Sequence, residues 1–390
     1  MKVAYIIPYL QKSSGWRTHT IGLIQAIRQY VEPLLFVSEE DLLPARSLFQ
    51  GLPIHSLPAT QQASLQSMTG WRKLAAAYGS IRRANLDGIA LVHSLEAYPT
   101  GLVGSWLARR VGSPHVITTH GTYGVIWHNS RLDRWAYANV LRNTALICPV
   151  SNGTAQIMRQ YFGDALGRAK IHPILNGNDF YKSVSVGEAA HRPVESKPVI
   201  LTVGDLKPRK GQHISLAAFA KVKAKIPQAE YHLVGHFDAD SVYYQQLKNY
   251  IADKQLEDVI FLGAISNGEL RRQYQQASVF VLTPQQEGLN FEGFGLVYLE
   301  AGAYGLPVVA TITGGVPDAV RQNETGYLLE PDDVSGIAQA IKTLLSDPEL
   351  NNRMGQANRR WAETLTWVRA AQEQYRAYQD LLGDNRQAYA

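Results

Sequence analysis

Short apolar runs and longer amphipathic segments alternate along the first half of the chain. The runs are nearly continuous and rich in β-branched residues, and the segments at 71–85 and 151–162 have helical spacing. Ser151 is placed to cap the second of these helices. Apolar strands that alternate with helices are typical of parallel sheets covered on both faces. The expected strands of this half are 3–7, 34–37, 90–93, 115–119, 145–150 and 170–175.

The same alternation restarts after a polar stretch without periodicity at 181–197, which we interpret as a linker. Two such series predict an α/β protein with two doubly wound, Rossmann-like domains. We place the N-terminal domain at 1–180 and the second domain at 198–365. The expected strands of the second domain are 199–203, 230–234, 259–262, 279–282 and 307–310.

The chain from Asp333 onward is predicted to be helical, with breaks at Pro348 and Thr366. We expect the last segment, 366–390, to form a helix that packs back toward the N-terminal domain. Ligands of open parallel sheets bind beyond the carboxyl ends of the strands. Two parallel sheets that face each other across a cleft would therefore offer one edge to a donor and the other to an acceptor.

The composition fits a protein of the cytoplasm. Hydrophobic residues make up 45% of the 390 residues, and no apolar stretch reaches the roughly 18 residues that a membrane-spanning helix needs. Pro8 interrupts the apolar start of the chain and no cleavage site follows, so we interpret this start as a buried strand and not as a signal peptide. The single cysteine, Cys148, permits no internal disulfide, and its apolar neighbours predict a core residue.

Charge is distributed unevenly between the two halves. Residues 1–180 contain 17 Lys and Arg against 9 Asp and Glu, whereas residues 181–390 contain 21 against 24. The excess indicates either contact with something anionic, such as the inner face of a membrane, or only a soluble surface. The basic stretches at 71–83 and 127–142 contain tryptophans and pose the same choice. They form amphipathic helices on a membrane surface, or their tryptophans pack inward under a charged face, which is the interpretation that we prefer.

The stretch from Glu292 to Glu300 contains the most informative candidate site. Gly293 and Gly295 follow an apolar strand and predict a helix start near Gly293, where free amides favour phosphate. The two glutamates are eight residues apart, so on one helix they would differ by about 80° and could face the same cleft. Carboxylates accept hydrogen bonds from hydroxyl groups, which predicts recognition of sugar and ribose.

This stretch resembles the donor-site signature of the retaining GT-B glycosyltransferases, in particular glycosyltransferase family 4. The resemblance is carried by the Glu-x7-Glu pair with Phe-Gly inside it, and by the segment 203–211 (VGDLKPRKG), which is similar to a strand-end loop of the family. Further matches are at 119–121 (THG), 150–151 (VS) and 176–177 (NG), so the resemblance covers nearly the whole chain.

The resemblance implies a role for each matching residue of the donor side. Lys210 would neutralise the donor diphosphate and stabilise the charge that grows on the leaving phosphate, with Gly204 and Arg209 in the same loop. Glu300 would hold the ribose hydroxyls, and Glu292 would hold the transferred sugar.

Backbone groups and one histidine complete the site that the resemblance implies. The amides of Phe294, Gly295 and Leu296 would bind phosphate and sugar oxygens, and Gly15 would let the first loop approach the donor. His120 would lie in the acceptor-side wall near the reacting carbon. The catalytic residues expected on this basis are His120, Lys210 and Glu292.

Two positions depart from the pattern of the family. Asp205 stands where the family usually has an arginine, so either Arg209 or Lys207 takes over the diphosphate, or the loop is arranged differently. In the first loop, the segment 13–16 (SSGW) replaces the two adjacent glycines that many members have, which leaves Gly15 alone.

The resemblance implies a retaining hexosyltransferase that needs no metal or other cofactor. Its donor would be a nucleotide sugar, a UDP-sugar by preference and a GDP-sugar as the alternative. Its acceptor would be a glycan or a lipid-linked precursor in surface polysaccharide or glycolipid synthesis, on the inner face of the membrane. Asp238 and Asp240 have the spacing of a metal site in glycosyltransferases of another fold, but their polar surroundings predict solvated side chains.

Other functions stay open. One is a sugar-nucleotide epimerase or a phosphorylase on the same fold, and another is a nucleotide-sugar-binding protein with a degenerate donor site, which Asp205 suggests. The sequence has no dinucleotide fingerprint after its first strand and no phosphate loop with Gly-Lys-Ser/Thr. We expect no nucleic-acid partner.

Overall fold

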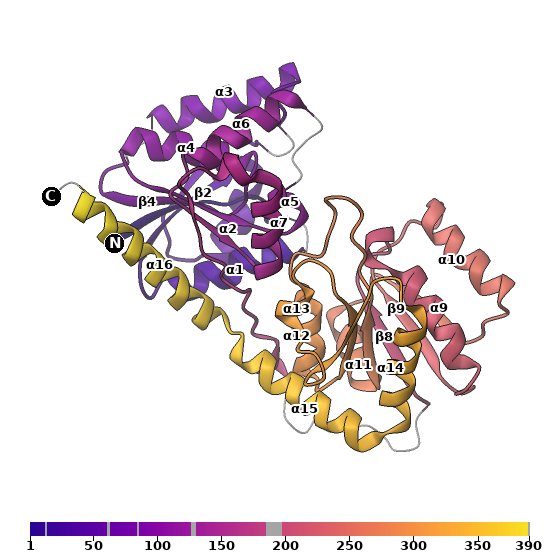
Figure 1. Cartoon of the computed structure of the whole chain (residues 1–390). Coiled ribbons are helices and arrows are strands. Elements are labelled where there is room, and N and C mark those ends of the chain that lie inside the picture. Colours follow the sequence, from indigo (N-terminus) through magenta and orange to yellow (C-terminus); the bar gives the residue numbers. More distant parts are fainter. Residues whose placement is uncertain (12–13, 61–62, 84–85, 126–129, 185–196, 389–390) are drawn as a thin grey trace. The chain divides into compact units, whose positions relative to one another are not determined.

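The computed structural model describes residues 1–11, 14–60, 63–83, 86–125, 130–184 and 197–388. The chain forms two compact units (Figure 1). The first unit is Met1–Gly177 together with Thr366–Ala390, and the second is Asn178–Leu365. Most of the predicted linker at 181–197 lies outside the described residues.

A parallel sheet forms the centre of the first unit. Within the described residues its strands follow the order β3-β2-β1-β4-β5-β6-β7, so the direction of winding reverses between β1 and β4. The carboxyl ends of the strands at such a reversal leave a crevice in which ligands bind. The strands are β1 (Lys2–Ile6), β2 (Glu32–Ser38), β3 (Ile54–Leu57), β4 (Ile89–Ser94), β5 (His115–Thr119), β6 (Leu146–Pro149) and β7 (Lys170–Ile171).

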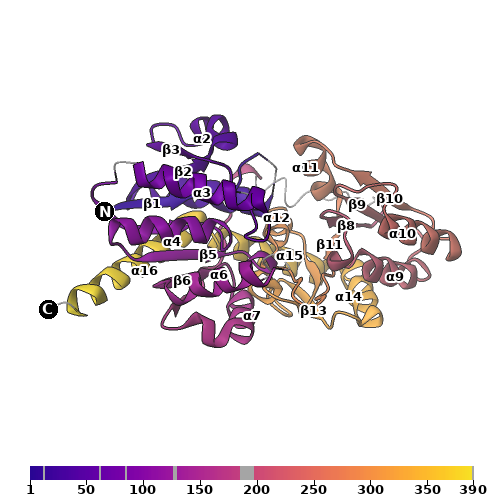
Figure 2. The same ribbon diagram turned by 90° about the horizontal axis from the view of Figure 1, so that it is seen from above.

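Helices cover both faces of this sheet, because alternate side chains of β1 point to opposite sides. Val3 and Tyr5 pack in one apolar cluster with α1 and α16, whereas Ala4 and Ile6 pack in another with α3 and α4 (Figure 2). The α-helices described in this unit are α1 (Gly15–Ile27), α2 (Leu42–Leu48), α3 (Met68–Arg83), α4 (Thr100–Val111), α5 (Thr122–Val125), α6 (Arg131–Arg142), α7 (Asn152–Phe162) and α16 (Trp367–Ala388).

The second unit has a parallel sheet of the same kind. Its described strands follow the order β10-β9-β8-β11-β12-β13, and the winding reverses between β8 and β11. The carboxyl ends of these two strands therefore define the second crevice. The strands are β8 (Val199–Val203), β9 (Glu230–Val234), β10 (Val259–Gly263), β11 (Val279–Leu282), β12 (Val308–Thr311) and β13 (Gly326–Leu329).

The main core of the second unit lies between the sheet and three helices. Phe219 of α9, Leu247 of α10 and Ile341 of α14 are buried against the strands. Helix α12 packs closely against α15. The side-chain amide of Asn358 in α15 donates a hydrogen bond to the Leu306 carbonyl, just after α12 (2.8 Å). The α-helices described in this unit are α9 (Gln212–Lys223), α10 (Val242–Asp253), α11 (Asn267–Gln276), α12 (Leu296–Ala303), α13 (Val316–Ala319), α14 (Val334–Ser346) and α15 (Pro348–Thr364).

Several local expectations are confirmed. Ser151 caps α7, because its Oγ accepts a hydrogen bond from the Thr154 amide (2.9 Å). The tail breaks at both expected positions, since α15 starts at Pro348 and α16 starts directly after Thr366. Cys148 is buried in the core of the first unit.

Three expectations are wrong. β3 and β13 were not expected, because β3 contains His55 and Ser56 and β13 starts with a glycine, so neither has a continuous apolar run. The helix expected near Gly293 starts at Leu296. Trp71 and Trp135, the tryptophans of the two basic stretches that the structure describes, do not pack inward, because they are 52% and 65% exposed.

Trp127, which belongs to the second basic stretch, lies outside the described residues. In the part of the chain that the structure describes, no helix combines the length and the apolar character that crossing a bilayer requires.

Candidate functional site

Two loops of the second unit meet at the carboxyl ends of β8 and β11. Gly211 ends the 3-10 turn η4 (Pro208–Lys210) with φ +71°, and a Cβ there would lie 1.7 Å from the Thr283 carbonyl oxygen. The Thr283 hydroxyl donates to the Gly211 carbonyl (2.8 Å), and the Gln285 amide donates to the Arg209 carbonyl (2.8 Å). Only glycine permits this approach, so Gly211 fixes the position of the residue before it, Lys210.

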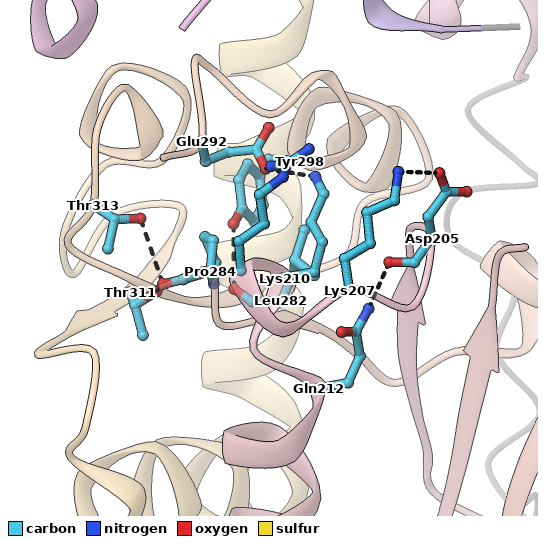
Figure 3. A network of polar contacts seen from close by, with 11 residues as sticks. Asp205, Lys207, Lys210, Gln212, Leu282, Pro284, Glu292, Tyr298, Thr311 and Thr313 are labelled. Carbon is cyan, nitrogen blue, oxygen red and sulfur yellow. Dashed lines mark hydrogen bonds and ion pairs between the residues drawn. The ribbon is translucent and has the colours of Figure 1, made fainter. Parts of the chain in front are cut away.

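A charged cluster occupies the junction of the two loops (Figure 3). The Lys210 ammonium lies 2.5 Å from Oε2 of Glu292, and Nη1 of Arg209 lies 3.5 Å from the same oxygen. The Lys210 and Glu292 side chains are only 14% and 12% exposed. Burial by itself raises the pKa of the Glu292 carboxyl, but the charges of Lys210 and Arg209 outweigh burial and hold that pKa below its usual value. The cluster is therefore an ionised, partly desolvated group of two cations and one anion.

The backbone of Glu292 is held by the Gly-Gly turn that follows β12. The Gly315 amide donates to the Glu292 carbonyl (2.9 Å), and a Cβ on Gly314, at φ +48°, would lie 2.3 Å from the same oxygen. Glu292 thus precedes α12 and does not belong to it. The expectation that Glu292 and Glu300 are related by helical geometry is wrong, and a turn and two cations orient Glu292 instead.

The start of α12 supplies backbone donors near Glu292. Gly295 is the N-cap residue with φ +87°, and the Tyr298 hydroxyl donates to the Leu282 carbonyl (3.2 Å), which ties the helix to the end of β11. Among the described residues, the amides of Phe294, Gly295 and Leu296 have no hydrogen-bond acceptor. Unpaired amides at a helix N-terminus are suited to bind anionic oxygens.

Glu300 lies one helical turn further along α12 in a more apolar setting. Its Oε2 accepts a hydrogen bond from the Tyr274 hydroxyl (3.1 Å), and the Tyr274 ring stacks on Tyr304 with centroids 5.0 Å apart. Burial raises the pKa of the Glu300 carboxyl to about 7, although the hydrogen bond from Tyr274 works in the opposite direction. Glu300 is therefore poised to change its charge near neutral pH.

The unusual Asp205 has a local partner. Its carboxylate forms an ion pair with Lys207 (3.0 Å), and both side chains are about half exposed. The Gln212 amide holds the Asp205 carbonyl (3.0 Å). Of the two cations considered as substitutes for the missing arginine, Lys207 pairs with Asp205 and Arg209 lies beside Lys210. Asp205 is thus neutralised locally, and Arg209 and Lys210 are brought together.

Gly204 stands at the end of β8, under the same cluster. Its amide donates to the Val234 carbonyl (2.8 Å), and a Cβ there would lie 3.9 Å from the aliphatic part of Lys210. The structure therefore brings the predicted donor residues of 203–211 and 292–300 to one edge of the second sheet. The roles that the resemblance assigns to them stay predictions.

In the first unit, His120 lies at the carboxyl end of β5. Its Nε2 is 3.0 Å from the Leu95 carbonyl, and its ring contacts His19 edge-on with centroids 4.6 Å apart. A carbonyl oxygen can only accept, so Nε2 carries a proton and Nδ1 has the free lone pair. Burial holds the pKa of the His120 imidazole well below its usual value, which keeps the ring neutral.

In the first loop, Ser14 and Gly15 stand where many family members have two adjacent glycines, and the structure shows what the serine does. Ser14 is the N-cap residue of α1, and its hydroxyl accepts a hydrogen bond from the Arg17 amide (3.2 Å). Gly15 is the first residue of α1, and no other atom lies near the place of its missing Cβ. The serine side chain thus accepts a hydrogen bond from an amide at the start of α1, which a glycine cannot do.

Sequence reasoning missed Glu96, which directly follows Leu95 after β4 at the reversal of the first sheet. Oε2 of Glu96 accepts a hydrogen bond from the Thr100 hydroxyl (3.0 Å). Burial raises the pKa of the Glu96 carboxyl to about 7. The available signal was a carboxylate two residues after the end of a buried central strand. Glu96 is next in sequence to Leu95, whose carbonyl accepts the hydrogen bond from His120.

The predicted solvation of Asp238 and Asp240 is confirmed. Both side chains are exposed, and the Asp240 amide donates to Oδ1 of Asp238 (3.0 Å) within their own turn. Among the described residues, no group of three or more His, Cys, Asp and Glu side chains has the arrangement of a metal site.

Comparisons with known proteins match both halves of the chain. The family model "Glycosyltransferase Family 4" matches residues 14–180, and "Glycosyl transferases group 1" matches residues 188–361. A GDP-mannose-dependent alpha-(1-6)-phosphatidylinositol monomannoside mannosyltransferase of Mycolicibacterium smegmatis is 32% identical over 275 residues, which cover 68% of this chain and 70% of that protein. A glycosyltransferase of Methanocaldococcus jannaschii is 26% identical over 382 residues, or 98% of this chain and 99% of its own.

Solved structures share the fold over nearly the full length. Sucrose-phosphate synthase from Thermosynechococcus elongatus has a TM-score of 0.73 at 21% identity, with 98% and 99% of the two chains covered. Anabaena HepE in complex with UDP and glucose has a TM-score of 0.72 at 21% identity, with 97% and 99% covered. The two doubly wound parallel sheets are therefore those of a GT-B glycosyltransferase. The chain belongs to glycosyltransferase family 4.

Proposed function

We propose that this glycosyltransferase moves a sugar from a nucleoside diphosphate sugar to a hydroxyl group of a glycan or a lipid-linked acceptor, with retention of the anomeric configuration. The observation that carries the proposal is the cluster of Lys210, Arg209 and Glu292 at the reversal of the second sheet. Two partly buried cations held by a single carboxylate are suited to receive a diphosphate, because its charge can replace that of the carboxylate.

The cluster suggests how donor binding prepares the site. When the diphosphate takes the two cations, Glu292 is released and can accept hydrogen bonds from the hydroxyls of the transferred sugar. Lys210 then stabilises the charge that develops on the leaving phosphate. The unpaired amides at the start of α12 bind further oxygens of phosphate and sugar, and Glu300 holds the ribose.

The first donor to test is GDP-mannose, because the Mycolicibacterium relative is by name GDP-mannose-dependent. UDP-sugars come next. The same relative is by name a phosphatidylinositol monomannoside mannosyltransferase, which supports a lipid-linked or glycan acceptor in surface glycolipid or polysaccharide synthesis. We place the enzyme on the inner face of the membrane as a peripheral protein, in line with the basic first half of the chain.

The proposal is tested by nucleotide release with and without acceptor, followed by NMR of the product. Acceptor-dependent release and a product with the donor's anomeric configuration are expected. Conversion of the donor to an isomeric nucleotide sugar without net nucleotide release would favour an epimerase, phosphate-dependent turnover would favour a phosphorylase, and donor binding without turnover would favour a binding protein. A product with inverted anomeric configuration would contradict the proposed retention but not the proposed sugar transfer.

We expect His120→Ala to lower turnover by at least tenfold while donor affinity changes less than twofold, since one lost hydrogen bond to the reacting partners is worth about 1.5 kcal/mol. The reason is that neutral His120, with a free Nδ1, belongs to the proposed acceptor side. Initial rates beside calorimetric donor binding measure both effects. Intact turnover would assign His120 a purely structural role.

We expect full activity in the presence of a chelator. Lys210 and Arg209 supply the positive charge that a metal supplies in other glycosyltransferases. Asp238 and Asp240 are exposed, and the Asp238 carboxylate accepts the Asp240 amide within their own turn. Rates are compared before and after EDTA treatment, with Mg²⁺ and Mn²⁺ added back. A loss of activity that either cation restores would contradict this expectation.

A further inference from the structure

A basic pocket lies between α3 and α4 on the first unit, and the proposed transfer reaction assigns no role to the residues that line it. Its volume is about 610 Å³. Aromatic side chains form one wall, where the Tyr78 and Trp106 rings meet edge-on with centroids 5.4 Å apart. The residues that line the pocket are Tyr78, Ile81, Arg82, Trp106, Arg109 and Arg110.

The lining has the chemistry of a phosphate site. It contains three guanidinium groups and no carboxylate. Arg82 and Arg109 are exposed, and within the described residues neither forms an ion pair with a carboxylate. Arginine binds phosphate through two parallel hydrogen bonds. Positive charge in the last turn of α4 stabilises that helix, which accounts for the presence of Arg109 and Arg110. It does not account for Arg82, which belongs to α3 and lines the same pocket.

The surface next to the pocket is apolar and aromatic. Met68, Trp71 and Tyr78 are 72%, 52% and 46% exposed, and their spacing together with that of Arg82 places all four on one face of α3. The buried face of the same helix carries Leu74, Ala77 and Ile81. Exposed Trp and Tyr flanked by arginine are typical of helices that lie in the interfacial layer of a membrane.

A second exposed group belongs to the same surface. Leu132 and Trp135 of α6 are 53% and 65% exposed. Asp133, between them, is buried and accepts hydrogen bonds from the Ser64 hydroxyl (2.5 Å) and the Leu65 amide (2.8 Å), just before α3. One carboxylate therefore holds the starts of α3 and α6 together, so the two exposed apolar groups lie in the same region of the unit (Figure 1).

We propose that the pocket between α3 and α4 is a seat for the phosphate of an anionic lipid headgroup, with the exposed aromatic residues of α3 and α6 entering the interfacial layer around it. A free phosphate in solution would match the arginines but would leave the exposed Trp71, Tyr78 and Trp135 without a role. The inference rests on the peripheral membrane association proposed above and names the residues and ligand group responsible for it.

The test uses the full chain and two double variants that remove the same charge. The seat variant, Arg82→Gln with Arg109→Gln, removes two arginines from the pocket. The control variant, Arg28→Gln with Arg46→Gln, removes two exposed arginines elsewhere on the first unit. Co-sedimentation compares vesicles of phosphatidylcholine with vesicles that also contain phosphatidylinositol. Thermal unfolding and donor turnover confirm that each variant is folded.

The wild type is expected to bind the anionic vesicles and not the neutral ones, with an effect that salt removes. The seat variant is expected to lose about tenfold or more in affinity, since each basic residue near an anionic surface contributes about fivefold, while the control loses less than threefold. Arg82→Lys with Arg109→Lys keeps the charge but not the planar fork, and a severalfold loss is expected from it as well.

Three outcomes would overturn the inference. Equal losses in the seat and control variants would mean that the attraction is diffuse, although membrane association itself would stand. Equal binding of the wild type to both vesicles, or to neither, would remove the membrane association together with the seat. Thermal stabilisation by inorganic phosphate that the seat variant loses, with unchanged vesicle binding, would show a site for a soluble phosphate instead.

Discussion

Lys210→Ala is expected to lower the rate of nucleotide-sugar turnover by between tenfold and about a hundredfold, because a charge-assisted hydrogen bond is worth roughly 1.5–3 kcal/mol. The substitution acts twice. It removes the cation that we propose stabilises the leaving phosphate, and it leaves the largely buried Glu292 carboxylate with only Arg209 as a partner, at 3.5 Å. Initial rates and the affinity for the nucleotide diphosphate measure the effect.

The loop provides a matched control in Lys207. This lysine is three residues away, half exposed, and paired with Asp205 and not with Glu292. Lys207→Ala is expected to change the rate less than twofold, because an exposed ion pair contributes about 0.2–1 kcal/mol at most. Equal losses in the two variants would mean that the loop binds the donor through its summed charge. A wild-type rate in Lys210→Ala would remove the proposed donor site.

The fold was predictable from the sequence where strands are buried on both sides. Such strands are continuous apolar runs, as in β1, where Val3 to Ile6 are all buried, and in β11, where the whole strand is buried. The prediction fails for β3, whose partly exposed sequence contains His55 and Ser56 and has no such run. Periodicity therefore predicts the centre of a parallel sheet better than its edge.

Sequence motifs single out candidate residues for the site, but they do not predict how these residues are arranged. Lys210 and Glu292 are 82 positions apart, and their pairing follows from the reversal of the sheet between β8 and β11, which no local pattern reveals. Glu292 was expected at the start of a helix, but α12 starts about one turn later, at Leu296, because Gly295 is its N-cap residue with φ +87°. Local sequence patterns therefore do not predict contacts between loops that are far apart in the sequence.

The exposure of Trp71 and Trp135 shows a similar limit. An amphipathic helix with a tryptophan among basic residues has the same pattern whether the tryptophan faces the core or a membrane. Only the packing of α3 decides, since Leu74, Ala77 and Ile81 already fill the side that faces the sheet. The sequence interpretation chose the inward orientation because burial is the common fate of tryptophan in soluble proteins.

Glu300→Gln is expected to weaken donor binding by about tenfold at pH 8 and progressively less below pH 7. The pKa of the Glu300 carboxyl is about 7 because the group is buried, so the wild type itself loses the negative charge as the pH falls through neutrality. A carboxylate accepts two ribose hydroxyls more strongly than a neutral amide does. Calorimetric donor binding across the pH range measures the ratio of wild type to variant, and a ratio independent of pH would contradict the proposed role.

The same substitution is expected to stabilise the fold above neutral pH. The folded pKa of about 7 lies above the usual 4.5, so the folded state binds more protons than the unfolded state between these values, and stability falls as the pH rises through this window. The wild type thereby loses about 3 kcal/mol by pH 8, a loss that a neutral glutamine avoids. Thermal unfolding of Glu300→Gln should therefore match the wild type near pH 4.5 and exceed it by several degrees at pH 8. A gain in stability together with a loss of donor binding in Glu300→Gln would match the trade-off between stability and function that is common at functional sites. A variant less stable than the wild type at pH 8 would assign Glu300 to the structure of α12 instead.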